Sequence, residues 1–138
     1  MENKLSLHIA PSVNRIIAKK INEYVYWLTN NYNFPLTVNI YIYGSKYVLS
    51  GSGEHVSANF WGPFDKQGDS TIKVSAGDYT DLLRNNSFED TILMIINSIS
   101  HEVQHYYQWV DDLDFDEEDA EYGATELTTE YMESLTSV

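Results

Sequence analysis

The sequence predicts a single α+β domain over residues 1–138, with an N-terminal helix, a small mixed or antiparallel sheet and two C-terminal helices. Three patterns lead to this prediction: helical spacing of apolar residues near the N-terminus, an alternating segment after it, and a long apolar stripe in the C-terminal half. A hydrophobic content of 43% over 138 residues supplies enough apolar side chains for one core. We find no internal repeat and no linker that would divide the chain.

The first helix is expected from Ser12 to about Asn30, and Ser12 is a plausible N-cap. The apolar residues that recur there at helical spacing are Val13, Ile16, Ile17, Ile21, Tyr24 and Leu28. The next segment alternates between two faces, which predicts a strand from Leu36 to Tyr43. Between Gly44 and Gly77, short apolar pieces are separated by Gly, Ser and Asp, so we expect two or three further short strands.

A long helix is expected from Phe88 to about Trp109, because one apolar stripe runs along this segment. The stripe consists of Ile92, Ile95, Ile96, Ile99, Val103, Tyr106 and Val110. An acidic turn from Val110 to Phe115 should end this helix and reverse the chain. A last helix is then expected from Asp116 to Ser134.

Composition excludes several kinds of site. The chain has no cysteine, which rules out disulfides, thiolate metal sites and a cysteine nucleophile, and leaves His, Asp and Glu as possible metal ligands. No segment approaches the roughly 18 apolar residues of a membrane helix, and the N-terminus lacks a signal-peptide pattern. We therefore expect a soluble, cytoplasmic protein without a membrane partner.

The negative charge is concentrated in the C-terminal part of the chain. Residues 1–84 contain all eight Lys and Arg and seven acids, whereas residues 85–138 contain fourteen acids and no base. Such a surface repels phosphate backbones and attracts cations or basic proteins. No direct nucleic-acid partner is expected, although a protein that imitates the charge of DNA would have a similar composition.

The segment "HEVQH" places two histidines one helical turn apart, with Glu102 directly after the first. His101 and His105 can therefore point in the same direction and bind one ion. Zinc held by two imidazoles and a carboxylate keeps a fourth position for water, and Glu102 can act as general base towards that water. The alternative interpretation is a helix face whose histidines pair with nearby acids.

A third ligand has to come from the acidic segment that follows. This segment contains Asp111, Asp112, Asp114, Asp116, Glu117, Glu118, Asp119 and Glu121. On one continuous helix Glu117 would lie about 18 Å from His105, so the chain must reverse between them. Spacing along the sequence leaves all eight of these acids open as the third ligand. A regular EF-hand calcium loop is excluded, since its glycine and its final glutamate are missing.

Together, "HEVQH" and "EEDAEYGA" resemble the gluzincin family of zinc metallopeptidases, including its compact ImmA/IrrE-like members. The resemblance implies a minimal zincin-like fold in which the long helix is the active-site helix. It implies a Zn²⁺ cofactor bound by His101, His105 and Glu117, with Glu121 supporting a histidine. By this resemblance Glu117 is the first candidate for the third ligand, Glu121 the second and Asp119 the third. The chain departs from the family in having Glu121 where Asp or Asn is usual, and in the short interval between the two motifs.

Two further parts of a peptidase site have weaker candidates. Val56–Gly62 is similar to the edge strand on which thermolysin-like peptidases align substrates, although an aromatic-rich strand is more often core. Tyr122 or Tyr106 is a candidate for stabilising an oxyanion. The leading hypothesis is a zinc peptidase whose substrate is a protein or peptide with a basic surface. The alternative is an acidic interaction or DNA-mimic module on the same scaffold, with a structural or absent metal.

Overall fold

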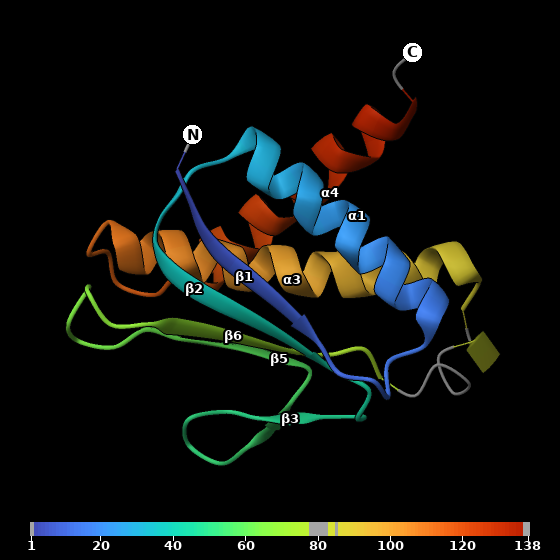
Figure 1. Cartoon of the computed structure of the whole chain (residues 1–138), viewed down its shortest axis with the longest axis horizontal. Helices are drawn as coiled ribbons and strands as arrows, with labels where there is room; N and C mark the ends of the chain where they lie inside the picture. The colour runs from blue at the N-terminus through green and yellow to red at the C-terminus, as the bar shows by residue number, and fades with distance from the viewer. Residues whose placement is uncertain (1, 78–82, 85, 137–138) are drawn as a thin grey trace.

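The computed structural model describes residues 2–77, 83–84 and 86–136, and its mixture of helices and a small sheet confirms the α+β class (Figure 1). The main sheet contains β1 (Asn3–Ile9), β2 (Phe34–Tyr43), β5 (Ala58–Trp61) and β6 (Ser70–Ser75). A separate pair consists of β3 (Val48–Leu49) and β4 (His55–Val56). The helices are α1 (Arg15–Asn31), α3 (Phe88–Val110) and α4 (Glu117–Thr136).

The four-stranded sheet is mixed, with the strand order β1-β2-β6-β5. The strands β1, β2 and β6 are parallel, whereas β5 runs antiparallel to β6. The parallel neighbours β1 and β2 are joined by α1, as a parallel pair requires a crossover connection. Because β5 is the last strand in this order, it forms one edge of the sheet.

The chain begins with a strand, so the prediction of a helix as the first element is wrong. In β1 the partly buried Leu5, Leu7 and Ile9 alternate with exposed residues, which is the period of a strand with one covered face. The expected N-cap is also wrong. Asn14 caps α1 instead of Ser12, because its Oδ1 accepts hydrogen bonds from the N–H groups of the first turn.

The segment between Gly44 and Gly77 forms four strands rather than the two or three expected. Two of them, β3 and β4, are only two residues long and pair with each other through Val48 and Val56. The strand β6 lies inside the sheet next to β2, and β5 lies at the edge. The weak sequence pattern is explained by the shortness of β3, β4 and β5, which leaves too few residues for a clear alternation.

The helices lie on one face of the main sheet (Figure 1). The sheet residues on that face are Val38, Ile40, Ile42, Ile72 and Val74, all of them buried. They belong to one apolar cluster with the inner sides of α1 and α3, to which Leu127 and Tyr131 of α4 also belong. The opposite face of β2 carries the partly exposed Asn39 and Tyr41. This two-layer arrangement places α3 against β5 and β6.

Both C-terminal helices lie close to their predicted bounds, and an acidic turn separates them. Asp112 adopts a left-handed backbone with φ 56°, which ends α3. Asp116 then caps α4, since its Oδ1 accepts a hydrogen bond of 3.0 Å from the N–H of Asp119. The turn reverses the chain, so α4 packs back along α3 and brings its first residue to the centre of α3.

Replacing Gly62 by Ala should destabilise the fold. Gly62 follows β5, and a Cβ atom there would lie 2.6 Å from the Trp109 ring. That ring cannot move freely, because Trp109 Nε1 donates a hydrogen bond of 2.9 Å to the carbonyl of Pro63. We expect a loss of about 1–3 kcal/mol in the free energy of unfolding, measured by urea denaturation. Gly51→Ala is the control, since no atom lies within 4 Å of the added Cβ; equal losses in both variants would contradict this account.

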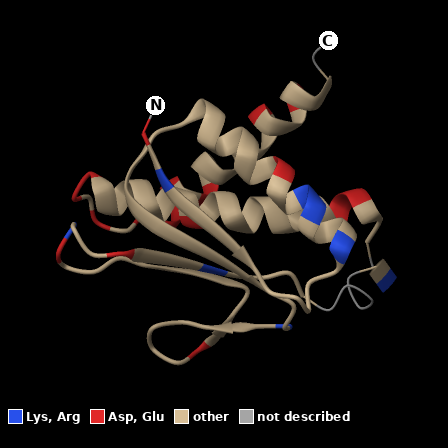
Figure 2. Cartoon of the chain, in the orientation of Figure 1, with Lys and Arg blue, Asp and Glu red and all other residues tan. Residues whose placement is uncertain are grey.

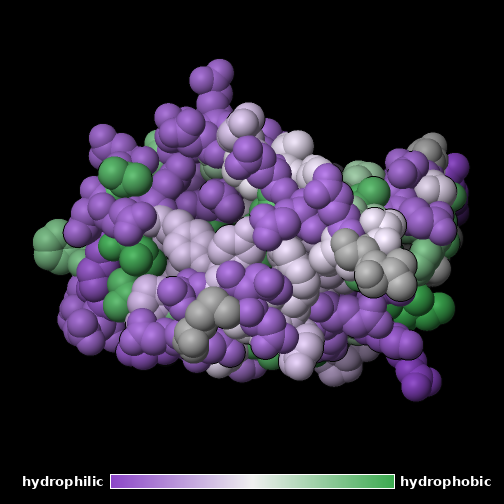
Figure 3. All heavy atoms as spheres, turned by 90° about the horizontal axis from the view of Figure 1, so that it is seen from above, coloured by the Kyte–Doolittle hydropathy of each residue, from purple (hydrophilic) through white to green (hydrophobic). Residues whose placement is uncertain are grey.

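The acidic residues gather along the turn between α3 and α4 and along α4, whereas α1 carries several Lys and Arg residues (Figure 2). The surface seen from above is largely hydrophilic, with hydrophobic residues in separate small patches (Figure 3). Within the described ranges, no helix has both the length and the apolar character needed to cross a membrane.

Candidate metal centre

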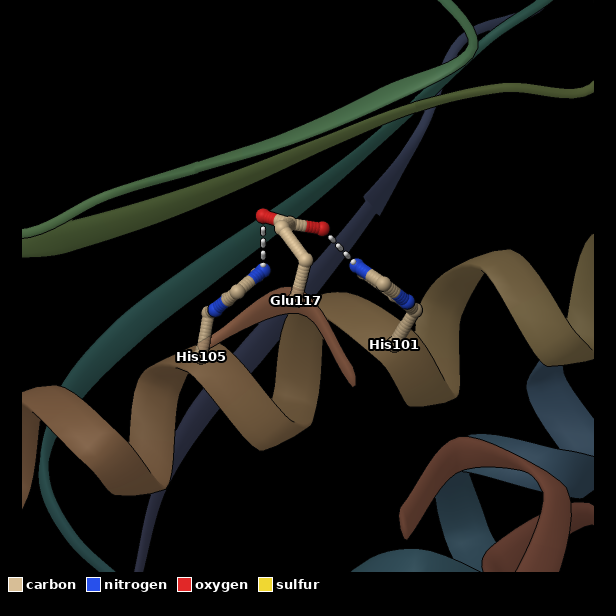
Figure 4. Close-up of side chains that lie close together, drawn as sticks. All are labelled: His101, His105 and Glu117. Atoms are coloured by element: carbon tan, nitrogen blue, oxygen red, sulfur yellow. Dashed lines mark hydrogen bonds and ion pairs between the residues drawn. The ribbon is translucent and has the colours of Figure 1, made fainter. Parts of the chain in front are cut away.

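Two histidines of α3 and the first residue of α4 converge on one point (Figure 4). The ring centroids of His101 and His105 lie 4.9 Å apart. Glu117 lies between them, with Oε2 2.9 Å from His101 Nε2 and Oε1 2.9 Å from His105 Nε2. One potential ligand atom from each of the three residues lies within 4.8 Å of the others. This group can therefore hold a metal ion.

The remaining ring nitrogens of both histidines have hydrogen-bond partners of their own. His101 Nδ1 lies 3.0 Å from Glu121 Oε2, and His105 Nδ1 lies 2.8 Å from Gln108 Oε1. An acceptor at Nδ1 holds a proton there and leaves Nε2 available to a metal, an arrangement common among metal-binding histidines. Two imidazoles and one carboxylate with supported rings fit a divalent cation such as zinc.

Of the three acids considered for the third ligand, only Glu117 faces both Nε2 atoms. Glu121 lies one turn further along α4 and contacts the opposite side of the His101 ring. Asp119 is exposed and belongs to no group that could hold a metal among the described residues. The Asp116 cap sets the start of α4 at Glu117. This start decides which of the three acids faces the two histidines.

Gln108 joins the two helices at this centre, a role that the sequence analysis missed. Its Oε1 accepts from His105 Nδ1 and also, at 3.3 Å, from the N–H of Asp116. Its Nε2 donates to the carbonyl of Asp116 at 3.2 Å. One amide thus holds His105 and the residue directly before Glu117. The available signal was spacing, since Gln108 lies three residues after His105 and shares its helix face.

Glu102 is a buried acid beside the His101–His105–Glu117 group, with 7% of its surface exposed. Burial raises the pKa of Glu102 to about 7, although the neighbouring His101 and His105 act in the opposite direction. The backbone N–H of Phe60 in β5 donates a hydrogen bond to this carboxylate. A carboxyl group with such a pKa can both accept and release a proton near neutral pH.

The pKa of His101 is shifted upward by the acids around it. Burial acts to lower this pKa, but the hydrogen bond with Glu117 and the charge of Glu102 outweigh it, and Glu121 adds to their effect. The centre therefore concentrates negative charge around one imidazole, which favours a bound cation.

The converging residues line a cavity of about 500 Å³. Its walls are the segment Val56–Phe60, which includes most of β5, and the α3 residues Asn97 and Ser98. The His101–His105–Glu117 group, Glu102, Glu121 and Phe115 complete them. The cavity is large enough for several atoms of a peptide beside a metal ion. Three of the residues that line it are glutamates and none is Lys or Arg.

Neither tyrosine considered for an oxyanion-stabilising role reaches this cavity. Tyr106 is fully buried, and its hydroxyl donates to the carbonyl of Leu36 at 2.7 Å. Tyr122 is 68% exposed and hydrogen-bonds with Glu126 on the outer side of α4. Both assignments are therefore wrong. Asn97, which the sequence analysis did not consider, does line the cavity one turn before His101.

Removing the amide of Gln108 should weaken metal binding. In Gln108→Leu, His105 Nδ1 and both backbone groups of Asp116 lose their partner, so we expect zinc affinity to fall about 10–100-fold. Competition with a chromophoric chelator measures this loss. The matched control is Gln104→Leu, on the same helix but outside the cavity. Unchanged affinity in Gln108→Leu, or an equal loss in both variants, would disprove the role of the amide.

Comparisons with models of protein families, with curated proteins and with solved structures find no match for this chain, so the chemistry of the site is inferred from its own residues.

Proposed function

We propose that this chain is a zinc-dependent metallopeptidase of the gluzincin type, with a minimal zincin-like fold. The observation that carries the proposal is the position of the buried Glu102, next to a convergent His101–His105–Glu117 group and inside an open cavity. A structural metal site has no need of a proton acceptor beside it. The cavity also provides access for a substrate.

Each polar residue of the centre has a distinct role in this reaction. His101, His105 and Glu117 would hold the ion, while Glu121 and Gln108 orient the two imidazoles. A bound zinc ion supplies Lewis acidity and lowers the pKa of water to about 7. Glu102 would accept a proton from the attacking water and later donate it to the leaving amine.

The open edge of β5 supports an extended peptide as the substrate. Ser57 directs its carbonyl towards β6, where it accepts a hydrogen bond of 2.8 Å from the N–H of Ser75. Backbone groups alternate in direction along a strand, so those of Ala58 and Phe60 face the open edge. The N–H of Phe60 is used by Glu102, which leaves both backbone groups of Ala58 and the carbonyl of Phe60 to pair with a bound peptide.

The charge of the site favours a neutral or basic substrate over an acidic one. Glu102, Glu117 and Glu121 line the cavity, and the segment 111–121 adds six further acids next to it. Such a surface attracts basic proteins or peptides and repels nucleic acid. We propose a basic protein or peptide as the substrate.

The alternative function is binding of a basic partner, or imitation of DNA, by the acidic surface, with the metal in a structural role. The exposed acids along the α3–α4 turn and α4 support it (Figure 2). Tight, salt-sensitive binding of a basic protein that persists in a His101→Ala, His105→Ala double variant would favour this alternative.

The deciding experiment for the peptidase is digestion of a random heptapeptide mixture, followed by mass spectrometry of the fragments. The zinc-loaded wild type and the Glu102→Gln variant are compared under the same conditions. Fragments produced by the wild type alone support the proposal. No fragments from either protein, when each carries one zinc ion, contradict it.

A further inference from the structure

The cavity runs along α3 and has two chemically different ends. Asn97, His101 and His105 follow each other at intervals of four residues on one helix face, so each lies about 6 Å from the next. A cleft of about 12 Å accommodates three to four residues of an extended chain. The strand β5 runs beside α3 in the same direction, since Phe60 contacts Trp109 near the end of α3.

The end near His105 is aromatic. The ring of Phe115 lies 5.2 Å from the His105 ring and 5.9 Å from the Phe60 ring, measured between centroids. These contacts hold Phe115 on two sides, yet 56% of its surface is exposed and it lines the cavity. A held aromatic ring with an open face offers a binding surface for an apolar group.

The end near Asn97 is polar. Asn97 and Ser98 line the cavity there, and Asn97 Oδ1 accepts a hydrogen bond of 3.3 Å from the hydroxyl of Thr128 in α4. A large apolar side chain placed at this end would cover amide and hydroxyl groups without replacing their hydrogen bonds to water, which is unfavourable. The two ends therefore favour different side chains.

We propose that the cavity selects peptides with a large apolar side chain at the His105 end, where that side chain packs on Phe115. This inference rests on the proposed function, in so far as the bound molecule is a peptide aligned along β5. Phe115 is a specificity-determining residue in this scheme and takes no part in the chemical step. Preference for a large over a small apolar side chain in such a pocket is of the order of 10–200-fold.

The test measures peptide selection without hydrolysis. The zinc-loaded Glu102→Gln protein is immobilised, a random heptapeptide mixture is passed over it, and the retained peptides are sequenced by mass spectrometry. We expect Leu, Ile, Met or Phe to be enriched about tenfold over Ala at one position. Adding Phe115→Ala should abolish this enrichment, and adding Phe115→Leu, which keeps an apolar surface, should preserve most of it.

Leu113→Ala provides the matched control, since Leu113 belongs to the same turn, is 61% exposed and does not line the cavity. This variant should leave the enrichment unchanged. An enrichment that survives in Phe115→Ala, falls equally in Leu113→Ala, or is absent from the start would overturn the inference.

Digestion of the same mixture by wild-type protein separates this inference from the proposed function. If peptides are retained selectively but none is cleaved, the proposed peptidase activity is contradicted and the side-chain preference is supported. If the Phe115→Ala variant cleaves the same peptides as the wild type, the side-chain preference is contradicted and the proposed peptidase activity is supported.

Discussion

Replacing Glu102 by Gln is expected to abolish measurable peptide hydrolysis while leaving zinc bound. Gln has the shape of Glu and can still accept the hydrogen bond from the Phe60 N–H, but it cannot take a proton from water. A positioned general base contributes about 10²–10⁴-fold to a rate, so the initial rate of fragment formation should fall by this factor. Elemental mass spectrometry of the same samples verifies that the zinc content is unchanged.

The same variant should be more stable than the wild type at alkaline pH when no metal is present. The folded-state pKa of Glu102, about 7, lies above the ordinary glutamate value of 4.5, so folding favours the protonated form. This contribution is fully present below about pH 4.5 and is lost as the pH rises through 7. At pH 8 the ionised, buried Glu102 costs about 1–3 kcal/mol, which Gln avoids.

Urea denaturation at pH 5 and pH 8, in the presence of a chelator, measures this difference. The two proteins should have similar stabilities at pH 5, and the variant should be the more stable one at pH 8. A variant that is less stable at both pH values would show that Glu102 serves the fold, and the role of general base would lose its support. Destabilising charge is retained in proteins mainly where function requires it.

The long periodic elements could be predicted from the sequence. The helix α3 carries an apolar residue at each turn, and β2 alternates over its full length, so both were located to within two residues. The pair His101 and His105 follows from spacing alone. The strand β1 was not predicted, although Leu5, Leu7 and Ile9 alternate with polar residues there and carry the period of a strand.

Which acid joins His101 and His105 could not be predicted, because eight acids fall within residues 111–121. Their spacing along the sequence does not show which of Glu117, Asp119 and Glu121 reaches the two histidines. The choice depends on tertiary contacts: the Asp116 cap fixes where α4 begins, and Gln108 holds Asp116 beside His105. Burial of Tyr106 against β2 is equally non-local, since its hydroxyl partner, Leu36, lies seventy residues away. Such contacts have no short-range signature in a single sequence.

Removing a metal ligand should have the second large effect. His101→Ala and Glu117→Ala each take one of three donors from the group, so zinc affinity should fall by more than the roughly 10–100-fold typical of losing an outer hydrogen-bond partner. Glu121→Ala removes only the partner of His101 Nδ1 and should fall within that smaller range. Asp119→Ala, in the same helix turn but outside the group, should bind zinc as the wild type does.

Elemental mass spectrometry and chelator competition on these four variants rank the three acids directly. About one zinc ion per wild-type chain, with the affinity order Asp119→Ala, Glu121→Ala and then Glu117→Ala, agrees with the geometry in which Glu117 alone faces both Nε2 atoms. A greater loss in Glu121→Ala than in Glu117→Ala would instead make Glu121 the ligand and Glu117 its support. If the wild type binds no zinc at neutral pH, the histidines are a helix face paired with acids, and the basic-partner alternative becomes the stronger one, since the exposed acids remain without a metal to explain them.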